Sequence, residues 1–224
     1  MTAARGDRRA KRAVRAGQVF VISAPSGGGK TTVVKRLQRL LPRLVRSISV
    51  TTRPPRQGER AERAYRFVSL PTFQRFQREG ALLEWAKVHG AYYGTPKRPI
   101  LEALARGRDV ILSIDVQGAR QIRRALGQRA LLIFLLPPSM AQLRRRLLRR
   151  RTEAPEAVHR RLTAAAQELA CASWYDTTVV NDRLEHAVRV VRDLIQSHAS
   201  PATPSRGWAR RRPARGGTQR KGFA

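Results

Sequence analysis

The stretch that decides the fold reads Val19-Phe20-Val21-Ile22-Ser23-Ala24-Pro25-Ser26-Gly27-Gly28-Gly29-Lys30-Thr31-Thr32. An apolar, β-prone run leads into a glycine-rich turn, and a helical pattern follows from Val33 to Leu41. A strand, a glycine-rich turn ending in Lys-Thr and a helix occur in this order in phosphate-binding P-loops. The alternative is a flexible turn before an ordinary helix, and the strand and helix on either side of the turn argue against it.

Each residue type in this stretch suits phosphate chemistry. Glycines let the backbone curl with its N–H groups pointing inward, and the start of the helix adds the positive end of its dipole. Lys30 can reach the β- and γ-phosphates of a nucleotide, and Thr31 can bind Mg²⁺. Ala24 stands where the pattern usually has its first glycine.

Composition limits the classes of protein to which the chain can belong. Its 224 residues suffice for one α/β domain with insertions or for two small domains. The single cysteine, Cys171, excludes an intrachain disulfide, which fits a reducing compartment. The histidines are scattered and no cysteine pairs accompany them, so we expect no metal–ligand cluster; they are His89, His159, His186 and His198.

The sequence predicts no membrane association. Its longest apolar run, Ala130 to Leu136, is too short to span a bilayer and is typical of a buried strand. The apolar stretch near the N-terminus continues into the P-loop, so it cannot be a removable signal peptide. We therefore expect a cytoplasmic protein.

The net charge of +31 is concentrated partly in two tails, residues 1–16 and 199–224. Both tails are rich in arginine and lack the apolar residues needed to offset the entropy of ordering, so we expect them to be disordered. Such tails could bind RNA weakly and in a salt-dependent manner, but we favour simple solvated tails. Monomer and homodimer both remain open.

Strands and helices alternate along most of the chain. The predicted strands Val19–Ser23, Asp109–Ile114, Ala130–Leu136 and Thr177–Val180 are each followed by a helix, which indicates a parallel sheet with helices on both faces. The segment from about 46 to 97 interrupts this rhythm and indicates an inserted lobe. Within it we expect an extended segment over 45–50 and a turn over 89–94. Ligands of such folds bind at the carboxyl ends of the strands.

A second candidate phosphate site lies in the inserted lobe. Arg53 and Arg56, joined by two prolines that limit the entropy lost on binding, could clamp one phosphate through their forked donors. In so arginine-rich a protein, a solvated loop is the alternative. The hydroxyl groups of Tyr65, Tyr93 and Thr95 could add further hydrogen bonds.

Glu84 stands on a predicted strand between apolar residues, where an unpartnered charge is costly. A carboxylate that accepts two adjacent N–H bonds fits the N1–H and the 2-amino group of guanine, whereas adenine presents neither. Without the other motifs, an ion pair with a nearby arginine would be the better explanation for Glu84.

Taken together, these motifs resemble those of the guanylate kinase family over residues 17–198. The resemblance rests on six segments in one unbroken order: 23–31, Ser49 to Glu59, Tyr92-Tyr93-Gly94-Thr95, Ile114-Asp115-Val116-Gln117-Gly118, Pro137-Pro138-Ser139 and Val180-Asn181-Asp182. It implies a P-loop NTPase-type α/β fold and a transfer of the γ-phosphoryl of ATP to GMP or dGMP, with Mg²⁺ as cofactor. It also implies a core (17–46, 98–138 and 171–198), a GMP-binding lobe (47–97) and a lid (139–170).

The resemblance also implies roles for individual residues. The ATP site would comprise Ala24, Pro25, Ser26, Gly27, Gly28, Gly29, Lys30, Thr31, Thr32, Asn181 and Asp182, with Mg²⁺ on Thr31. GMP would be bound by Ser49, Arg53, Arg56, Tyr65, Glu84, Tyr93, Thr95 and Asp115. Lys30, Arg56, Arg146, Arg150 and Arg161 would be catalytic, the last three from the lid.

One position departs from the family pattern. The central strand ends in Ser113-Ile114-Asp115, where the family usually carries two acids, so we expect weakened handling of Mg²⁺ with activity retained. Three other interpretations stay open: a kinase for another phosphate, such as a ribose bisphosphate or a different nucleoside monophosphate; a catalytically inactive binding module; and an RNA-binding protein. Glu84 argues against the first, and Lys30, Arg53 and Arg56 argue against the second. Deleting the tails would test the third, because catalysis should survive it.

Overall fold

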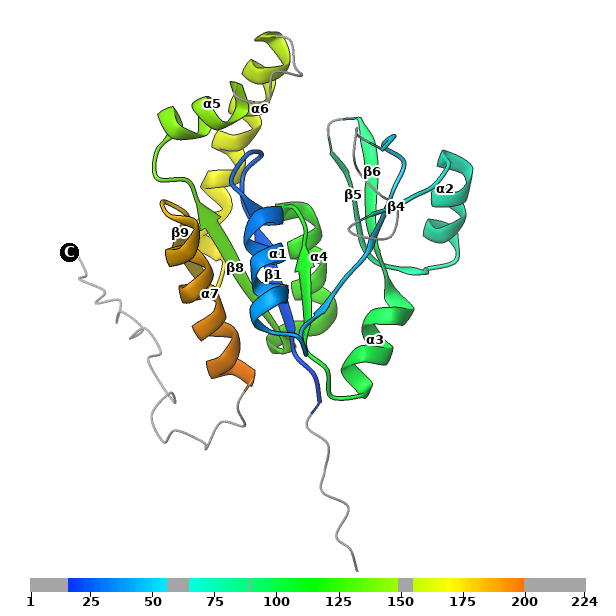
Figure 1. Ribbon diagram of the computed structural model, residues 1–224. Coiled ribbons are helices and arrows are strands. Elements are labelled where there is room, and N and C mark those ends of the chain that lie inside the picture. The colour runs from blue at the N-terminus through cyan, green and yellow to red at the C-terminus, as the bar shows by residue number, and fades with distance from the viewer. Residues whose placement is uncertain (1–15, 56–64, 89, 149–154, 200–224) are drawn as a thin grey trace, which may run out of the picture.

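The computed structural model describes residues 16–55, 65–88, 90–148 and 155–199, and Figure 1 shows their arrangement. The expectations for the two basic tails therefore lie outside the described residues, apart from Ala16 and Ala199 at their inner ends. Within the described ranges, no helix is long and apolar enough to cross a membrane.

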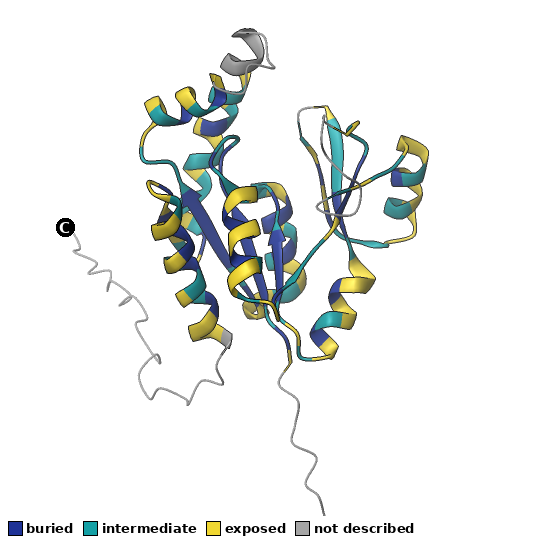
Figure 2. Ribbon diagram, viewed as in Figure 1, coloured by how far each residue is buried: buried dark blue, intermediate teal, exposed yellow. Residues whose placement is uncertain are grey.

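A five-stranded parallel sheet forms the centre of the molecule, with strand order β2-β7-β1-β8-β9. Its strands are β1 (Val19–Ser23), β2 (Val45–Arg46), β7 (Val110–Ser113), β8 (Ala130–Leu136) and β9 (Thr177–Val180). The prediction of an α/β fold with a parallel sheet between helices is confirmed. β1 lies in the middle because every one of its residues is apolar or small and buried, as Figure 2 shows in dark blue.

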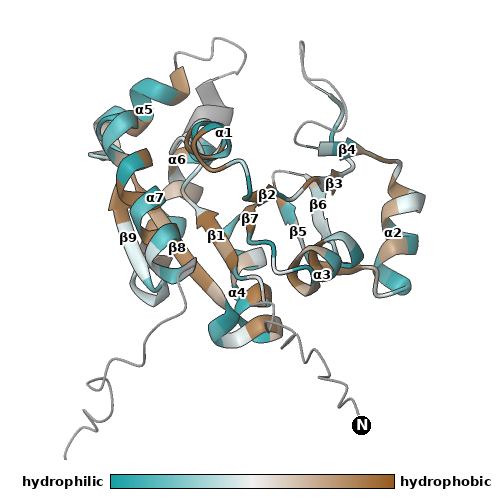
Figure 3. Cartoon of the chain, turned by 60° about the horizontal axis from the view of Figure 1, so that its bottom comes forward, coloured by the Kyte–Doolittle hydropathy of each residue, from teal (hydrophilic) through white to brown (hydrophobic). Residues whose placement is uncertain are grey.

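Alternate residues of β1 face two different hydrophobic clusters. Phe20 and Ile22 pack with α1 (Lys30–Leu40) and α7 (Leu184–Ala199), whereas Val19 and Val21 pack with α3 (Lys97–Ala105) and α4 (Val116–Leu126). Helices therefore cover both faces of the sheet, with hydrophobic strands inside and hydrophilic helix surfaces outside (Figure 3).

A second sheet, with strand order β4-β3-β6-β5, is built from the inserted segment. It consists of β3 (Ser49–Thr51), β4 (Tyr65–Phe67), β5 (Leu82–Val88) and β6 (Ala91–Pro96), and α2 (Leu70–Arg78) lies beside it. The remaining helices, α5 (Met140–Leu148) and α6 (Pro155–Ala170), stand on the other side of the loop that follows β1 (Figure 1). Short 3₁₀ turns at Gly127–Arg129 (η1) and Cys171–Trp174 (η2) complete the described elements.

Two expectations for the inserted segment are wrong. Residues 45–50 are not one extended segment, because β2 joins the five-stranded sheet and β3 joins the four-stranded one. Residues 91–94 are not a turn but belong to β6, which pairs antiparallel with β5 and β3. Gly94, which indicated a turn, instead permits close packing, because a Cβ there would lie 2.9 Å from the Leu82 side chain.

Candidate active site

The loop between β1 and α1 curls back on itself. Gly27 and Gly29 have φ angles of 84° and 95°, a conformation that favours glycine, and the Gly28 amide donates to the Pro25 carbonyl at 2.8 Å. From the end of β9, the buried Asn181 side chain donates to the Gly28 carbonyl at 2.8 Å. The loop is therefore shaped before any phosphate arrives.

Lys30 is half-buried at the start of α1, and its ammonium donates to the Ala24 carbonyl. Burial lowers the pKa of this ammonium, while the nearby carboxylates of Glu168 and Asp115 raise it. Thr31 and Thr32 follow in the first turn of α1, where both are exposed. The cation and the two hydroxyl groups expected at a phosphate site thus lie at one helix N-terminus.

An unexpected carboxylate lies on this loop. Glu168, near the end of α6, accepts a hydrogen bond from the Ser26 amide at 3.1 Å. Burial raises the pKa of the Glu168 carboxyl, and the Lys30 ammonium and the Ser26 amide lower it in part. A carboxylate therefore occupies a backbone donor of the kind that binds phosphate.

Glu84 and Thr95 form a buried pair on the neighbouring strands β5 and β6. The Thr95 hydroxyl donates to Glu84 Oε1 at 2.6 Å, and the two residues are 0% and 4% exposed, respectively. Burial, assisted by the charge of Asp115, raises the pKa of Glu84 to about 7, although the Thr95 hydrogen bond opposes the shift. Asp115 caps α4, where its Oδ1 accepts from the Gly118 amide at 2.8 Å.

Other residues expected around GMP gather on β3, β4 and β6. Ser49 is buried and lies opposite Tyr65, and the Tyr65 and Tyr93 rings meet edge to face at 5.9 Å. The Arg53 guanidinium lies over the Tyr65 ring, 5.5 Å from its centroid, and donates to the Pro54 carbonyl at 2.6 Å. The structure therefore brings Arg53, Tyr65 and Tyr93 together. Arg56 lies outside the described residues.

Two of the residues expected in the lid and beside the adenine, Arg146 and Asn181, contact each other. Arg146 of α5 donates to the Asn181 carbonyl at 3.0 Å, which links α5 to the residue that holds the P-loop. Arg161 is half-buried on α6, and Arg150 lies outside the described residues. Asp182 is exposed and lies 3.2 Å from the ring of His186.

This geometry agrees with a comparison against known families, in which the guanylate kinase model matches residues 16–198. The chain belongs to the guanylate kinase family. It is 49% identical to the guanylate kinase of Oleidesulfovibrio alaskensis over 178 residues, which cover 80% of this chain and 86% of that protein. It is 48% identical to that of Thermobifida fusca over 186 residues, which cover 83% and 93%.

A solved structure shows the same fold. The crystal structure of guanylate kinase from Anaplasma phagocytophilum matches with a TM-score of 0.70 and 31% identity, covering 83% of this chain and 88% of the other. Guanylate kinases transfer the γ-phosphoryl group of ATP to GMP, so the chain is a nucleoside monophosphate kinase.

Sequence reasoning assigned no role to three residues that lie at or next to the expected site: Glu168 contacts Ser26, Gly118 lies against Glu84, and Gln121 contacts Trp85, the residue after Glu84. Glu168 is an isolated acid in a helical stretch, and only the folded chain shows that it reaches the P-loop. Of the three, Gly118 could have been found from the sequence, because glycine is unfavourable inside a helix and its presence there indicates close packing.

Proposed function

We propose that this chain transfers the γ-phosphoryl of ATP to GMP, and to dGMP, with ATP on the P-loop and GMP on the four-stranded sheet. The observation that carries the proposal is Glu84, a buried carboxyl group whose hydrogen bonds within the described residues come from Thr95. Burying a carboxylate costs free energy that further donors offset. The adjacent N1–H and 2-amino groups of guanine are such donors, and a site built for them rejects adenine.

The phosphate of GMP would be held by Arg53, Arg56, Tyr65 and Tyr93, while Ser49, Glu84, Thr95 and Asp115 would surround the base. Arg53 is supported by its place over the rings of Tyr65 and Phe67, where its planar guanidinium is oriented by aromatic faces. Lys30 and the loop amides would bind the β- and γ-phosphates of ATP, with Asn181 and Asp182 on the adenine side. The attacking oxygen of GMP is already ionised, so no general base is required.

Catalysis then consists of positioning and charge stabilisation. Lys30 would stabilise charge on the transferring phosphoryl group from the ATP side, and Arg56 from the GMP side. Arg146, Arg150 and Arg161 would do so from the segment 139–170, which we propose acts as a lid that excludes water. We further propose that the enzyme acts in the cytoplasm, where it would return GMP to the purine nucleotide pool.

Mg²⁺ would be bound by the Thr31 hydroxyl together with phosphate oxygens, a donor set that suits this hard cation. Thr31 lies exposed in the first turn of α1, beside the loop that would hold those phosphates. When bound, the ion would supply positive charge that offsets the negative charge of the nucleotide phosphates. Within the described residues no cluster of three or more acids, histidines or cysteines could hold it alone, so the nucleotide must complete the site.

Ser113, the last residue of β7, puts a neutral hydroxyl where the family usually has an acid. We expect Ser113→Asp to lower the Mg²⁺ concentration that gives half-maximal rate, because a carboxylate attracts the hydrated cation. A titration of rate against Mg²⁺ at fixed ATP measures this, and an unchanged midpoint would contradict it.

The P-loop role is tested with Lys30→Ala. We expect kcat to fall by roughly a hundredfold or more, because the cation that stabilises the transferring group is removed. Lys35→Ala is the matched control, since Lys35 is exposed on the same helix. A folded Lys30→Ala protein with wild-type turnover would overturn the assignment.

A further inference from the structure

Helix α4 contacts the proposed base-reading strand through a side-chain amide. β5 is an edge strand of the four-stranded sheet, so some of its main-chain groups lack a strand partner. Gln121 of α4 supplies one: its Oε1 accepts from the Trp85 amide at 3.1 Å, and its Nε2 donates to the Trp85 carbonyl at 2.7 Å. The residue directly after Glu84 is thus fastened to α4 by a donor and an acceptor.

Gly118 lies one turn before Gln121, on the same face of α4. A Cβ added to Gly118 would lie 2.3 Å from Glu84 Oε2 and 3.0 Å from its Cδ, so the Glu84 carboxyl group would have to move. Gly118 has ordinary helical backbone, so its conformation does not require glycine. The missing side chain instead leaves room for the Glu84 carboxyl group.

The carboxyl group is therefore confined on several sides. Thr95 fixes Oε1, Gly118 limits Oε2, and Gln121 fixes the main chain of the next residue. The first turn of α4 also presents the positive end of its helix dipole, which favours an anion beside it. α4 itself is anchored in the core by the buried side chains of Ala119 and Ile122.

We propose that Gly118 and Gln121 are positioning residues that set the place of the Glu84 carboxylate and thereby the preference for guanine. This inference rests on the proposed reading of guanine by Glu84. It assigns α4 a second task, because Asp115, the N-cap of the same helix, also acts electrostatically on Lys30 of the proposed ATP site.

The first test is a double-mutant cycle between Gly118→Ala and Glu84→Ala. We expect Gly118→Ala to raise the KM for GMP about tenfold and to leave the KM for ATP within twofold, because the added methyl group displaces the carboxylate. In the Glu84→Ala background the same change should have no further effect on the KM for GMP. A Gly118→Ala enzyme with the wild-type KM for GMP would overturn the proposal.

The second test uses Gln121→Ala, which removes both bonds to Trp85 without adding bulk. We expect the KM for GMP to rise about threefold to tenfold relative to the KM for ATP, since the strand beside Glu84 loses its fixed position. Gln128→Ala is the control, because Gln128 is exposed and on the neighbouring turn. Equal loss with both substrates would indicate a merely structural role and contradict the proposal.

These measurements separate the inference from the function on which it rests. If Glu84→Ala alone leaves the KM for GMP unchanged, the reading of guanine by Glu84 is wrong. If Glu84→Ala raises that KM and either the Gly118→Ala or the Gln121→Ala variant leaves it unchanged, the reading of guanine stands and the proposed positioning by this pair is wrong. Circular dichroism checks that each variant folds. If Gly118→Ala does not fold, the Gln121→Ala measurement decides whether the positioning role holds.

Discussion

At the scale of single residues, the carboxyl groups of Glu84 and Glu168 lie at the two proposed substrate sites in different surroundings. Glu84 is buried, bonded to the Thr95 hydroxyl and close to the charge of Asp115. Glu168 is half-buried and lies between a backbone amide and the Lys30 ammonium. Their protonation and charge should therefore affect different substrates.

The affinity for GMP should rise with pH through the titration of Glu84. Its pKa of about 7 means that the carboxyl is largely neutral at pH 6 and largely ionised at pH 8, and only the ionised form accepts both guanine N–H bonds. We expect the KM for GMP to fall between pH 6 and 8. Glu84→Gln, with an amide that cannot titrate, should have a higher KM and lose this component. A pH profile shared by both proteins would contradict the assignment.

The same shift has a consequence for stability. The folded pKa of Glu84 lies above the unfolded value of 4.5, so the unfolded chain ionises first and the free energy of unfolding falls as pH rises from about 4.5 to 7. The shift corresponds to about 3 kcal/mol. Urea unfolding of the ligand-free protein and of Glu84→Gln across this range measures it, and a flat difference between the two would contradict it.

Removing the charge of Glu168 should strengthen ATP binding. The carboxylate occupies the Ser26 amide and lies near Lys30, two groups expected to bind phosphate, and it repels an incoming anion. We expect Glu168→Gln to lower the Kd for ATP about threefold or more. Glu185→Gln, at an exposed acid on α7, is the matched control. Weaker ATP binding by Glu168→Gln would show that the carboxylate supports the loop rather than competing with phosphate.

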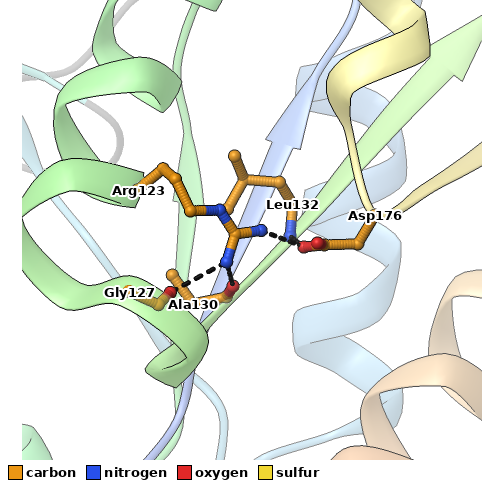
Figure 4. A network of polar contacts seen from close by, with 5 residues as sticks. All are labelled: Arg123, Gly127, Ala130, Leu132 and Asp176. Atoms are coloured by element: carbon orange, nitrogen blue, oxygen red, sulfur yellow. Dashed lines mark hydrogen bonds and ion pairs between the residues drawn. The ribbon is translucent and has the colours of Figure 1, made fainter. Parts of the chain in front are cut away.

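At the scale of elements, an arginine joins the end of α4 to β8 and to Asp176, the residue before β9 (Figure 4). Arg123 donates to the carbonyls of Gly127 and Ala130 at 2.8 and 3.0 Å and pairs with Asp176. Asp176 in turn accepts from the Leu132 amide at 2.7 Å. The network fixes the end of the helix whose beginning faces the proposed active site.

Arg123→Ala should destabilise the protein without changing its substrate preference. The Asp176 carboxylate would lose its cationic partner and two carbonyls would each lose the Arg123 donor, for a cost of about 2 kcal/mol in the free energy of unfolding. Arg124→Ala, at the exposed next position, should cost much less. Urea unfolding compares the two. Equal stabilities would contradict the role of the network.

The elements also show which features the sequence could predict. The P-loop and the strands around it were predictable because apolar runs and a spaced set of glycines, lysine and threonine occur together locally. β6 was not, because Gly94 indicates a turn unless the neighbouring strand is known to pack against it. Glu168 and Gln121 reach their partners across 142 and 36 residues, respectively, and no local pattern carries such information.

At the scale of the whole molecule, the five-stranded sheet carries the proposed ATP site and the four-stranded sheet the proposed GMP site, and α4 contacts both (Figure 1). Asp115 at the start of α4 acts electrostatically on Lys30 on one side and on Glu84 on the other. The arrangement suits a reaction in which two anionic substrates must meet with their phosphates in line.

The most direct test of this account is a coupled assay of ADP release with ATP and Mg²⁺, offering GMP, dGMP, AMP, CMP and UMP in turn. The account predicts turnover with GMP and dGMP and negligible turnover with the other three, because only guanine presents both donors to Glu84. Comparable turnover with AMP, or none with GMP from a folded protein that binds ATP, would contradict it.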